Sequence, residues 1–215
     1  MIYLIALLIV AALGGCLFLV FKHTGSHTGR VRRALAQQLD AEYRQFGALD
    51  KDVLEAGFSI THHSQFRHTR HQLLGQRNGV HFKVMDYAYV GVSGLAEQTV
   101  IVMDKVNQES GDFRVQPQRY HRNLQSDSFT DPDQNNLQTV AISELPNTLV
   151  MAQKPHAFEL RAQQAVYEWL QRHPDMVIEQ SQHLLMIFKP GRVLVDADAI
   201  MTAIDEALGL FDQGQ

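Results

Sequence analysis

The chain has 215 residues, with 23 acidic against 19 basic side chains and a net charge of −4. This balance argues against a nucleic-acid-binding protein, whose binding surface should be basic, so no nucleic-acid partner is expected. The single cysteine excludes an intrachain disulfide and a cluster of thiolate metal ligands.

The first 21 residues predict a membrane anchor. Between Ile2 and Phe21 the chain carries no charged side chain, and about twenty helical residues span roughly the 30 Å of a hydrocarbon core. We expect an uncleaved transmembrane helix at residues 1–21, because a secretory signal would have a charged start and a shorter apolar run. Residues 13–16 resemble a lipoprotein processing box that ends at Cys16, but the apolar run continues where a lipoprotein turns polar.

The charges that flank this helix predict its orientation. Lys22 and the arginines within residues 30–33 follow the apolar run, and the first acidic residue after it is Asp40. Because basic residues collect on the cytoplasmic side, we expect a single-pass protein of the inner membrane with its N-terminus outside and its body in the cytoplasm. The lipid bilayer is then one partner. The small residues Ala11 and Gly15 are spaced to seat a second helix, which would give a homodimer through the anchor.

Residues 22–57 predict a linker followed by a helical neck. Apolar side chains recur at helical spacing from Arg30 as far as Phe46. A second, shorter helix is expected between Asp50, a residue type that caps helices, and Gly57, a residue type that ends them. This neck would join the anchor to the body.

From His68 the pattern changes to that of strands. Asn78-Gly79 predicts a two-residue hairpin turn, because both residue types tolerate the positive φ that such a turn requires. The alternating run after this turn reaches Val90, and the next strand is expected at Thr99–Val106. Three strands joined by short turns predict an antiparallel meander.

The rest of the body, which we expect to span residues 58–215, combines further strands with two helices. Residues 107–136 are polar and predict a long loop or insertion, with room for one short element near Phe113 or at residues 120–124. Further expected elements are strands at 137–142 and 148–151, a helix at 156–172, a hairpin formed by 176–179 and 184–188, and a last helix capped by Asp196. The predicted fold class is α+β, with two helices packed on a largely antiparallel sheet built from the meander and the C-terminal hairpin.

Two parts of the sequence resemble a group of bacterial proteins. The first part is FKVMDYAYV, then TVIVM, then Leu145-Pro146 followed by a strand; the second is MVIEQSQHLLMIFKPGRVLVDADAIMTAIDEALGL. Together they are similar to bacterial single-pass membrane-anchored proteins of unknown function, over about residues 70–210. The resemblance implies an anchored α+β architecture and brings no assigned activity.

The most unusual local feature is a group of histidines at His62, His63, His68 and His71. Neutral imidazole binds zinc, nickel and copper, so a divalent transition metal is the candidate cofactor, and metal binding or sensing is an alternative function. On a strand, His63 and His71 would share one face, and His62 and His68 the other. The stretch contains no carboxylate and includes two arginines that would oppose a cation, which favours a polar surface segment.

Asp86, Tyr87 and Tyr89 place a carboxylate and two aromatic rings in one predicted strand. As a binding site they would form a recognition surface, with the rings as anchors for a partner. As a structural feature, the rings would pack across neighbouring strands, and Asp86 would bond to a turn or to a nearby arginine. The residue types favour the structural interpretation.

The sequence contains no local catalytic motif. Residues 91–95 lack the spacing of a nucleophile elbow, and no glycine-rich loop is built to hold a phosphate. We therefore name no catalytic residue and expect a membrane-tethered cytoplasmic interaction or accessory protein, with a protein partner in or at the membrane. The alternatives are the metal-binding protein and a hydrolase whose catalytic groups come together from distant positions.

Overall fold

The computed structural model describes residues 27–62, 67–91, 94–104, 111–120, 137–142, 145, 147–156 and 165–210. A first helix at residues 27–38 is followed by β1 (Glu42–Gly47), α2 (Lys51–Glu55), α3 (Ser59–His62), β2 (Arg67–Arg77), β3 (Val80–Gly91), β4 (Gly94–Met103), β5 (Phe113–Pro117), β6 (Gln138–Val140), β7 (Thr148–Ala152), α6 (Ala165–Arg172), β8 (Val177–Ser181), β9 (Leu184–Phe188) and α7 (Ala197–Gly209). The described strands form one nine-stranded sheet in the order β1-β2-β3-β4-β9-β8-β5-β7-β6. Every neighbouring pair is antiparallel, which confirms the predicted α+β class.

The predicted anchor at residues 1–21 lies outside the described residues. Among the helices that the structure describes, none combines the length and the apolar character that crossing a membrane requires. The anchor, its orientation and a dimer through it therefore stay predictions.

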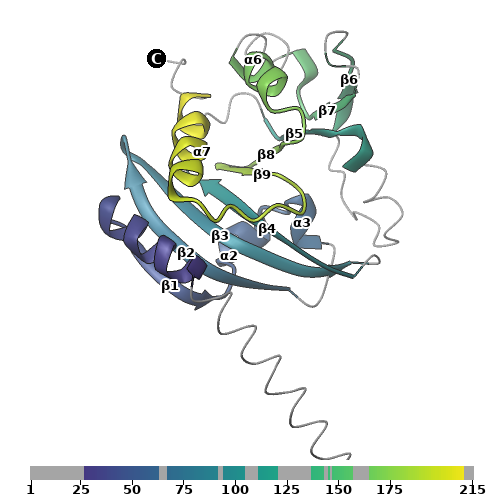
Figure 1. The fold of residues 1–215 in the computed structure, drawn as a ribbon. Coiled ribbons are helices and arrows are strands. Elements are labelled where there is room, and N and C mark those ends of the chain that lie inside the picture. The colour runs from purple at the N-terminus through teal and green to yellow at the C-terminus, as the bar shows by residue number, and fades with distance from the viewer. Residues whose placement is uncertain are drawn as a thin grey trace, which may run out of the picture.

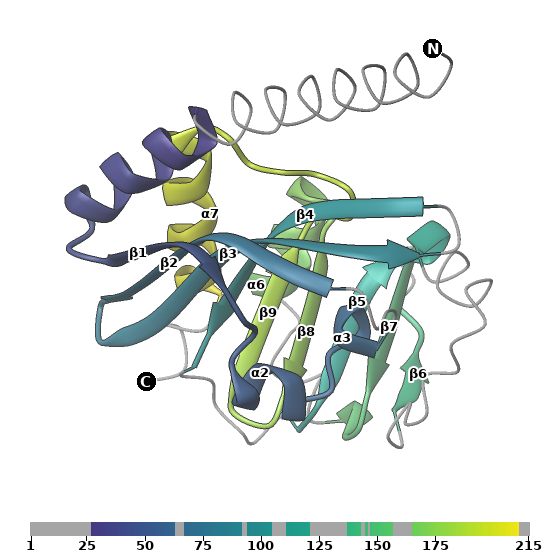
Figure 2. The same cartoon turned by 90° about the horizontal axis from the view of Figure 1, so that it is seen from below.

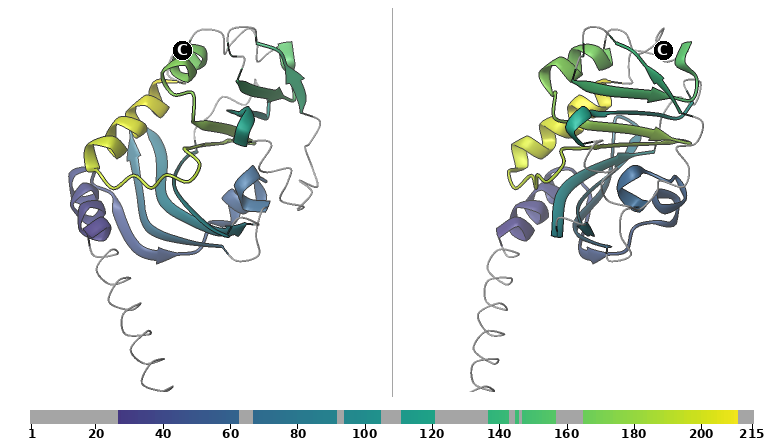
Figure 3. Two further views of the ribbon diagram at one scale, coloured as in Figure 1. Left: turned by 45° about the vertical axis from the view of Figure 1, so that its right-hand side comes forward. Right: turned by 90° about the vertical axis from the view of Figure 1, so that its right-hand side faces the viewer.

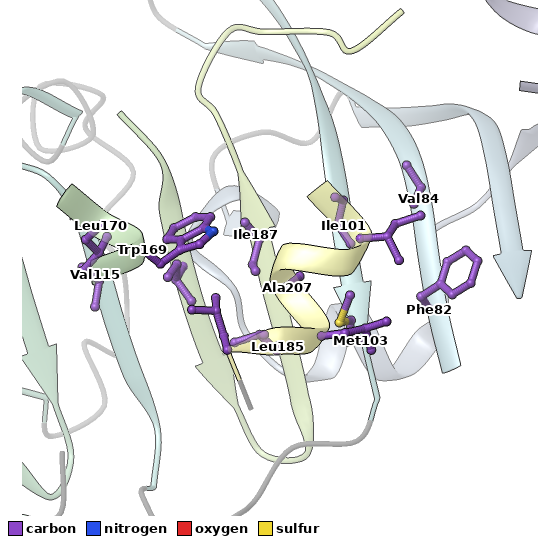
Figure 4. Close-up of a cluster of buried hydrophobic side chains, with 14 of the residues drawn as sticks. Phe82, Val84, Ile101, Met103, Val115, Trp169, Leu170, Leu185, Ile187 and Ala207 are labelled. Atoms are coloured by element: carbon purple, nitrogen blue, oxygen red, sulfur yellow. The ribbon is translucent and has the colours of Figure 1, made fainter. Parts of the chain in front are cut away.

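Each face of the sheet, whose strands are labelled in Figure 1, carries a hydrophobic core. The larger core contains buried side chains of the first helix, α6 and α7, and the smaller one those of α2 and α3. The strands curve around α2 and α3, while α7 and the first helix lie on the opposite face (Figure 3). Figure 4 shows part of the larger core, in which Trp169, Ile187 and Val84 come from three different elements. Full burial of one such apolar side chain contributes about 1.5–3 kcal/mol.

The predicted hairpin turn at Asn78-Gly79 is confirmed. Both residues have positive φ, 53° at Asn78 and 76° at Gly79, as a type I′ turn requires. Arg77 of β2 pairs directly with Val80 of β3 across the turn. The β3–β4 hairpin continues the meander. Its two strands pair as far as Gly91 and Gly94, which flank the turn between them.

The predicted first helix is wrong in its C-terminal part. The helix ends at residue 38, Asp40 adopts a positive φ of 50°, and β1 follows as an edge strand of the sheet. Tyr43 pairs with Leu73 of β2, so it continues a sheet and not a helical face. The apolar spacing of this stretch also fits a helix, and only the pairing with β2, which begins at Arg67, shows that the stretch is a strand. The short helix predicted after Asp50 is confirmed as α2.

One strand of the sheet comes from the stretch predicted as a polar loop. The prediction of a short element near Phe113 is confirmed by β5, but β5 lies between β8 and β7, and all five of its side chains are buried. The loop prediction is therefore wrong for these residues. Most of the other residues of this stretch, 107–110 and 121–136, lie outside the described part of the chain.

The C-terminal elements match their predictions. The hairpin of β8 and β9 lies in the middle of the sheet, between β4 and β5. Asp196 caps α7, because its side chain accepts a hydrogen bond from the backbone N–H of Asp198 at 3.2 Å. Ile200, Ile204 and Leu208 are buried on α7. Strands β6 and β7 are also confirmed, and α6 is the described part of the predicted penultimate helix.

Candidate functional site at the first helix

A buried ion pair fixes the first helix to the sheet. Arg32 lies on this helix, and its side chain is fully buried. Its Nη2 donates to Oδ1 of Asp86 on β3 at 2.7 Å. The same nitrogen lies 3.1 Å from Oγ1 of Thr99 on β4 and 3.1 Å from the carbonyl oxygen of Leu194, in the segment before α7. One guanidinium thus joins the helix to two strands and to the C-terminal segment.

The hydroxyl of Thr99 completes this hydrogen-bonded circuit. It donates to Oδ1 of Asp86 at 2.8 Å and accepts from the backbone N–H of Leu194 at 2.8 Å. The backbone N–H of Thr99 in turn donates to the carbonyl of Arg192 at 2.9 Å. We call Arg32, Asp86, Thr99 and Leu194 the helix clamp. Four segments that are distant in sequence meet in this clamp.

Burial dominates the electrostatics of the clamp. Burial lowers the pKa of Arg32 and raises the pKa of Asp86, and in each case the opposite charge of the partner acts against this effect. Within the described residues, Nε and Nη1 of Arg32 have no hydrogen-bond partner. Removing two charges from water costs free energy that their attraction recovers only in part. The pair is therefore better suited to fixing the helix in one position than to adding stability.

His71 lies beside the clamp, next to β1. Its Nδ1 is 2.8 Å from the hydroxyl of Tyr43, and burial lowers the pKa of His71 and raises that of Tyr43. The tautomer of the imidazole determines which of the two groups donates in this hydrogen bond. Gly29 lets the helix approach, since a Cβ there would lie 3.1 Å from the Tyr43 hydroxyl and 3.2 Å from His71 Cε1. The guanidinium of Arg33 lies 5.2 Å from the centre of the Tyr43 ring.

The predicted histidine ligands are not brought together in the described part of the chain. His71 is buried against Tyr43, whereas His68 is exposed on β2. His62 ends α3, and its side chain and all of His63 lie outside the described residues. No group of three or more histidine, cysteine or carboxylate side chains among the described residues is placed to hold a metal ion. The metal site stays a prediction.

The predicted recognition residues lie in the interior, on opposite faces of the sheet. Asp86 faces the first helix and bonds to an arginine, whereas Tyr87 and Tyr89 are buried in the core under α2 and α3. The hydroxyl of Tyr87 donates to the carbonyl of Ile60 at 3.0 Å, and burial raises the pKa of Tyr87 to about 12. In this structure the side chains of all three residues are buried. Their role as a recognition surface for a partner stays a prediction.

A second buried carboxylate holds α3 against the other face. Glu179 of β8 accepts hydrogen bonds from the backbone N–H of Ser59 at 2.7 Å and from the Ser59 hydroxyl. Nε of Arg114 on β5 lies 3.4 Å from Oε2 of Glu179. In the same core, burial raises the pKa of Tyr120 well above its ordinary value. Like Asp86 in the clamp, Glu179 positions backbone elements.

Sequence reasoning did not identify Arg32, Thr99 or Leu194. A signal for Arg32 does exist, because it precedes the buried residues Leu35 and Ala36 at helical spacing and so shares their face. Asp86 likewise interrupts an apolar strand. Two opposite charges at core positions indicate a buried pair, because neither charge is tolerated there alone.

Comparisons with known proteins identify a fold and no sequence family. No protein family matches the sequence, and no curated protein matches it. The structure is similar to the crystal structure of the mycobacterial trehalose monomycolate transport factor A, TtfA. The TM-score is 0.56 at 15% sequence identity, covering 85% of this chain and 89% of the other. At this identity, the likeness shows a shared fold.

Proposed function

We propose that the protein is a non-enzymatic accessory factor, tethered to the inner membrane by residues 1–21, whose cytoplasmic body binds a protein partner at the membrane. The observation that carries the proposal is the helix clamp. It is built on the helix that follows the predicted anchor in the sequence.

The clamp supports this function because it restricts how the body moves relative to an anchor. Residues 22–26 separate the apolar run from the first helix. The helix is held by the Arg32–Asp86 pair and by the core contacts of Leu35 and Ala36. A body held in this way presents a defined face to neighbours in the same membrane. A long flexible linker would instead suit a tethered enzyme that has to reach diffusing substrates.

The shared fold suggests a class of partner. TtfA is named as a transport factor for trehalose monomycolate. We extend the transport role, without the cargo, to this chain and propose that its partner belongs to a membrane transport assembly. The mainly positioning roles of the two buried carboxylates, Asp86 and Glu179, agree with a factor that binds and does not catalyse.

The test is purification of the tagged full-length protein from its own membranes in a mild detergent, followed by mass spectrometry of what stays bound. We expect one partner in stoichiometric amount. A variant in which residues 2–21 are replaced by an unrelated apolar helix should keep this partner if the body carries the binding surface. A protein that reproducibly purifies alone would contradict the proposal.

A matched pair of variants links the partner to the clamp. Arg32→Met removes the buried charge, whereas Arg33→Met removes the exposed charge next to it. At equal amounts of membrane-inserted protein, the first variant should retain less partner than wild type and the second about as much. Equal retention by both variants would show that the clamp plays no part in binding.

A further inference from the structure

Two exposed apolar side chains lie together at the end of the β3–β4 hairpin. Val90 is 47% exposed and Leu95 is 69% exposed, and the two residues pair directly across the hairpin. Side chains at even spacing along a strand share a face. Val90 is at even spacing from Asp86, and Leu95 at even spacing from Thr99. Both therefore project from the face that carries the helix clamp.

The surface between the hairpin end and the clamp is polar, and its carboxylate, that of Glu97, is paired with an arginine. His68 pairs with Ala88 and Ala88 with Glu97, so these three residues form a row across the face. Glu97 forms an ion pair with Arg70, which belongs to the next row. The side chain of His68 is exposed. The face thus combines an apolar end with imidazole and guanidinium groups.

The segment before α7 adds a further exposed apolar side chain beside the clamp. Leu194 is hydrogen bonded to Arg32 and Thr99, and Val195, which follows it, is 50% exposed. The nearby carboxylate of Asp196 is engaged as the cap of α7. We call Val90, Leu95, Val195 and His68 the hairpin face.

The first helix points its N-terminal end toward the hairpin face. At its C-terminal end the chain lies against β2, because a Cβ on Gly75 would lie 2.9 Å from Cβ of Ala41. Arg32 reaches Asp86, which is farther along β3 toward the hairpin end, and Gly29 adjoins His71. Figure 2 shows the N-terminal end of this helix directed toward the side on which β3 ends. The N-terminal end of the described chain, at residue 27, therefore lies on this side of the body.

We propose that the hairpin face rests on the lipid bilayer, with Val90, Leu95 and Val195 in the interfacial region and His68 at the headgroups. This inference rests on the proposed function, because it takes residues 1–21 as the anchor. Five linker residues, 22–26, span at most about 18 Å even when fully extended. The anchor would therefore hold this face close to the membrane surface.

Tethering also explains why so small an apolar surface is sufficient. Once the anchor is inserted, docking of the face is an intramolecular step with a high effective concentration of lipid. Interfacial binding depends on apolar area together with attraction between cations and anionic lipids. The exposed guanidinium of Arg33 on the first helix adds to that attraction. A tight protein interface would instead need a larger, well-packed apolar centre.

The test uses the full-length protein in nanodiscs of phosphatidylcholine and phosphatidylglycerol, with a fluorescent probe at one cysteine. A probe on the native Cys16 reports insertion of the anchor. In a Cys16→Ser background, Leu95→Cys reports the hairpin face. Gln76→Cys is the matched control, because Gln76 is also exposed but lies near the opposite end of the meander. We expect lipids with a nitroxide near the headgroup to remove most of the fluorescence at position 95 and little at position 76.

Three other outcomes would overturn the inference, and they have different meanings. If the probe at Cys16 contacts lipid and the probe at position 95 does not, the body stands away from the bilayer and the proposed function is untouched. If neither probe contacts lipid, the anchor is not inserted, and the proposed function fails as well. If the probe at position 95 is shielded in native membranes but is not quenched in nanodiscs, a protein covers this face.

Discussion

Replacing Arg32 by methionine tests the helix clamp directly. Methionine keeps an apolar stem but removes the guanidinium, and it leaves behind the carboxylate of Asp86, whose side chain is 2% exposed. Removing one partner of a buried pair costs about 3–5 kcal/mol. Asp86 keeps the hydrogen bond from the Thr99 hydroxyl at 2.8 Å. We therefore expect a loss near the lower end of that range, about 3 kcal/mol in the free energy of unfolding.

The pH dependence of this loss separates charge from packing. Burial raises the pKa of Asp86 in the folded protein above its ordinary value of 3.8, and the charge of Arg32 opposes this rise. Arg32→Met should therefore raise the pKa of Asp86 further. A carboxyl group with a raised folded pKa stabilises the fold fully below its unfolded pKa and loses this contribution as pH rises through the folded pKa. The variant should thus be less destabilised at about pH 5 than at about pH 8.

Urea titration of the full-length protein in a mild detergent measures both effects. Trp169 is the single tryptophan of the chain, and it is buried in the larger core, so its fluorescence reports unfolding. Arg33→Met is the control, with an expected loss of about 0.5–1 kcal/mol from its contact with the Tyr43 ring. A loss below about 1 kcal/mol for Arg32→Met, or an equal loss at both pH values, would refute the reasoning.

Three further predictions concern the surroundings of the clamp and the last helix. Burial lowers the pKa of His71 in the folded protein from its ordinary value of 6.5. As the pH is lowered through 6.5, the unfolded chain therefore binds a proton before the folded protein does, and the free energy of unfolding should decrease. His71→Gln should flatten this fall in urea titrations at several pH values; an unchanged profile would mean that His71 does not contribute to it. Ile204→Ala should cost about 2–5 kcal/mol and Ile204→Val about 0.5–1.5 kcal/mol in the same assay, and equal losses would contradict the packing of α7. Asp196→Ala should cost about 1 kcal/mol in thermal or urea unfolding, whereas Asp196→Asn, which keeps an accepting oxygen, should cost much less.

The parts of the fold that follow from the sequence are those set by neighbouring residues. Asn78-Gly79 requires a turn because of its backbone preferences, whatever the rest of the chain does. Asp196 marks the start of α7 for a similar local reason, since its side chain bonds a backbone N–H within the same turn. Signals of this kind are complete within a few residues.

Strands β1 and β5 were harder to predict, because their neighbours in the sheet are distant in sequence. β5 contains Arg114 and Gln116, which made it look like part of a polar loop, yet both side chains are buried. Their burial depends on β7 and β8, which come later in the chain. Tyr43 and Phe46 fitted a helical spacing by chance, and only pairing with β2 shows that they belong to a strand.

The candidate site follows the same rule. Asp86 is a carboxylate within a largely apolar strand, and the sequence predicts that it bonds either to a turn or to a nearby arginine. Its partner Arg32 lies on a helix near the start of the chain, and Leu194 lies in the last quarter. No spacing rule links such positions, so the clamp becomes visible only when the fold brings them together.

The position of the C-terminal hairpin determines when the protein can finish folding. β4 ends at Met103, and its neighbour β9 begins at Leu184, so the middle of the sheet forms from pairs that are far apart in the chain. As the chain leaves the ribosome, β1 to β4 can pair before the rest of the sheet forms, because each of them pairs with the next strand along the chain. The β4 edge of this meander then stays unpaired until β9 has been made, and unpaired edges recruit other chains. By pairing with β4, β9 therefore protects the meander from recruiting other chains at this edge.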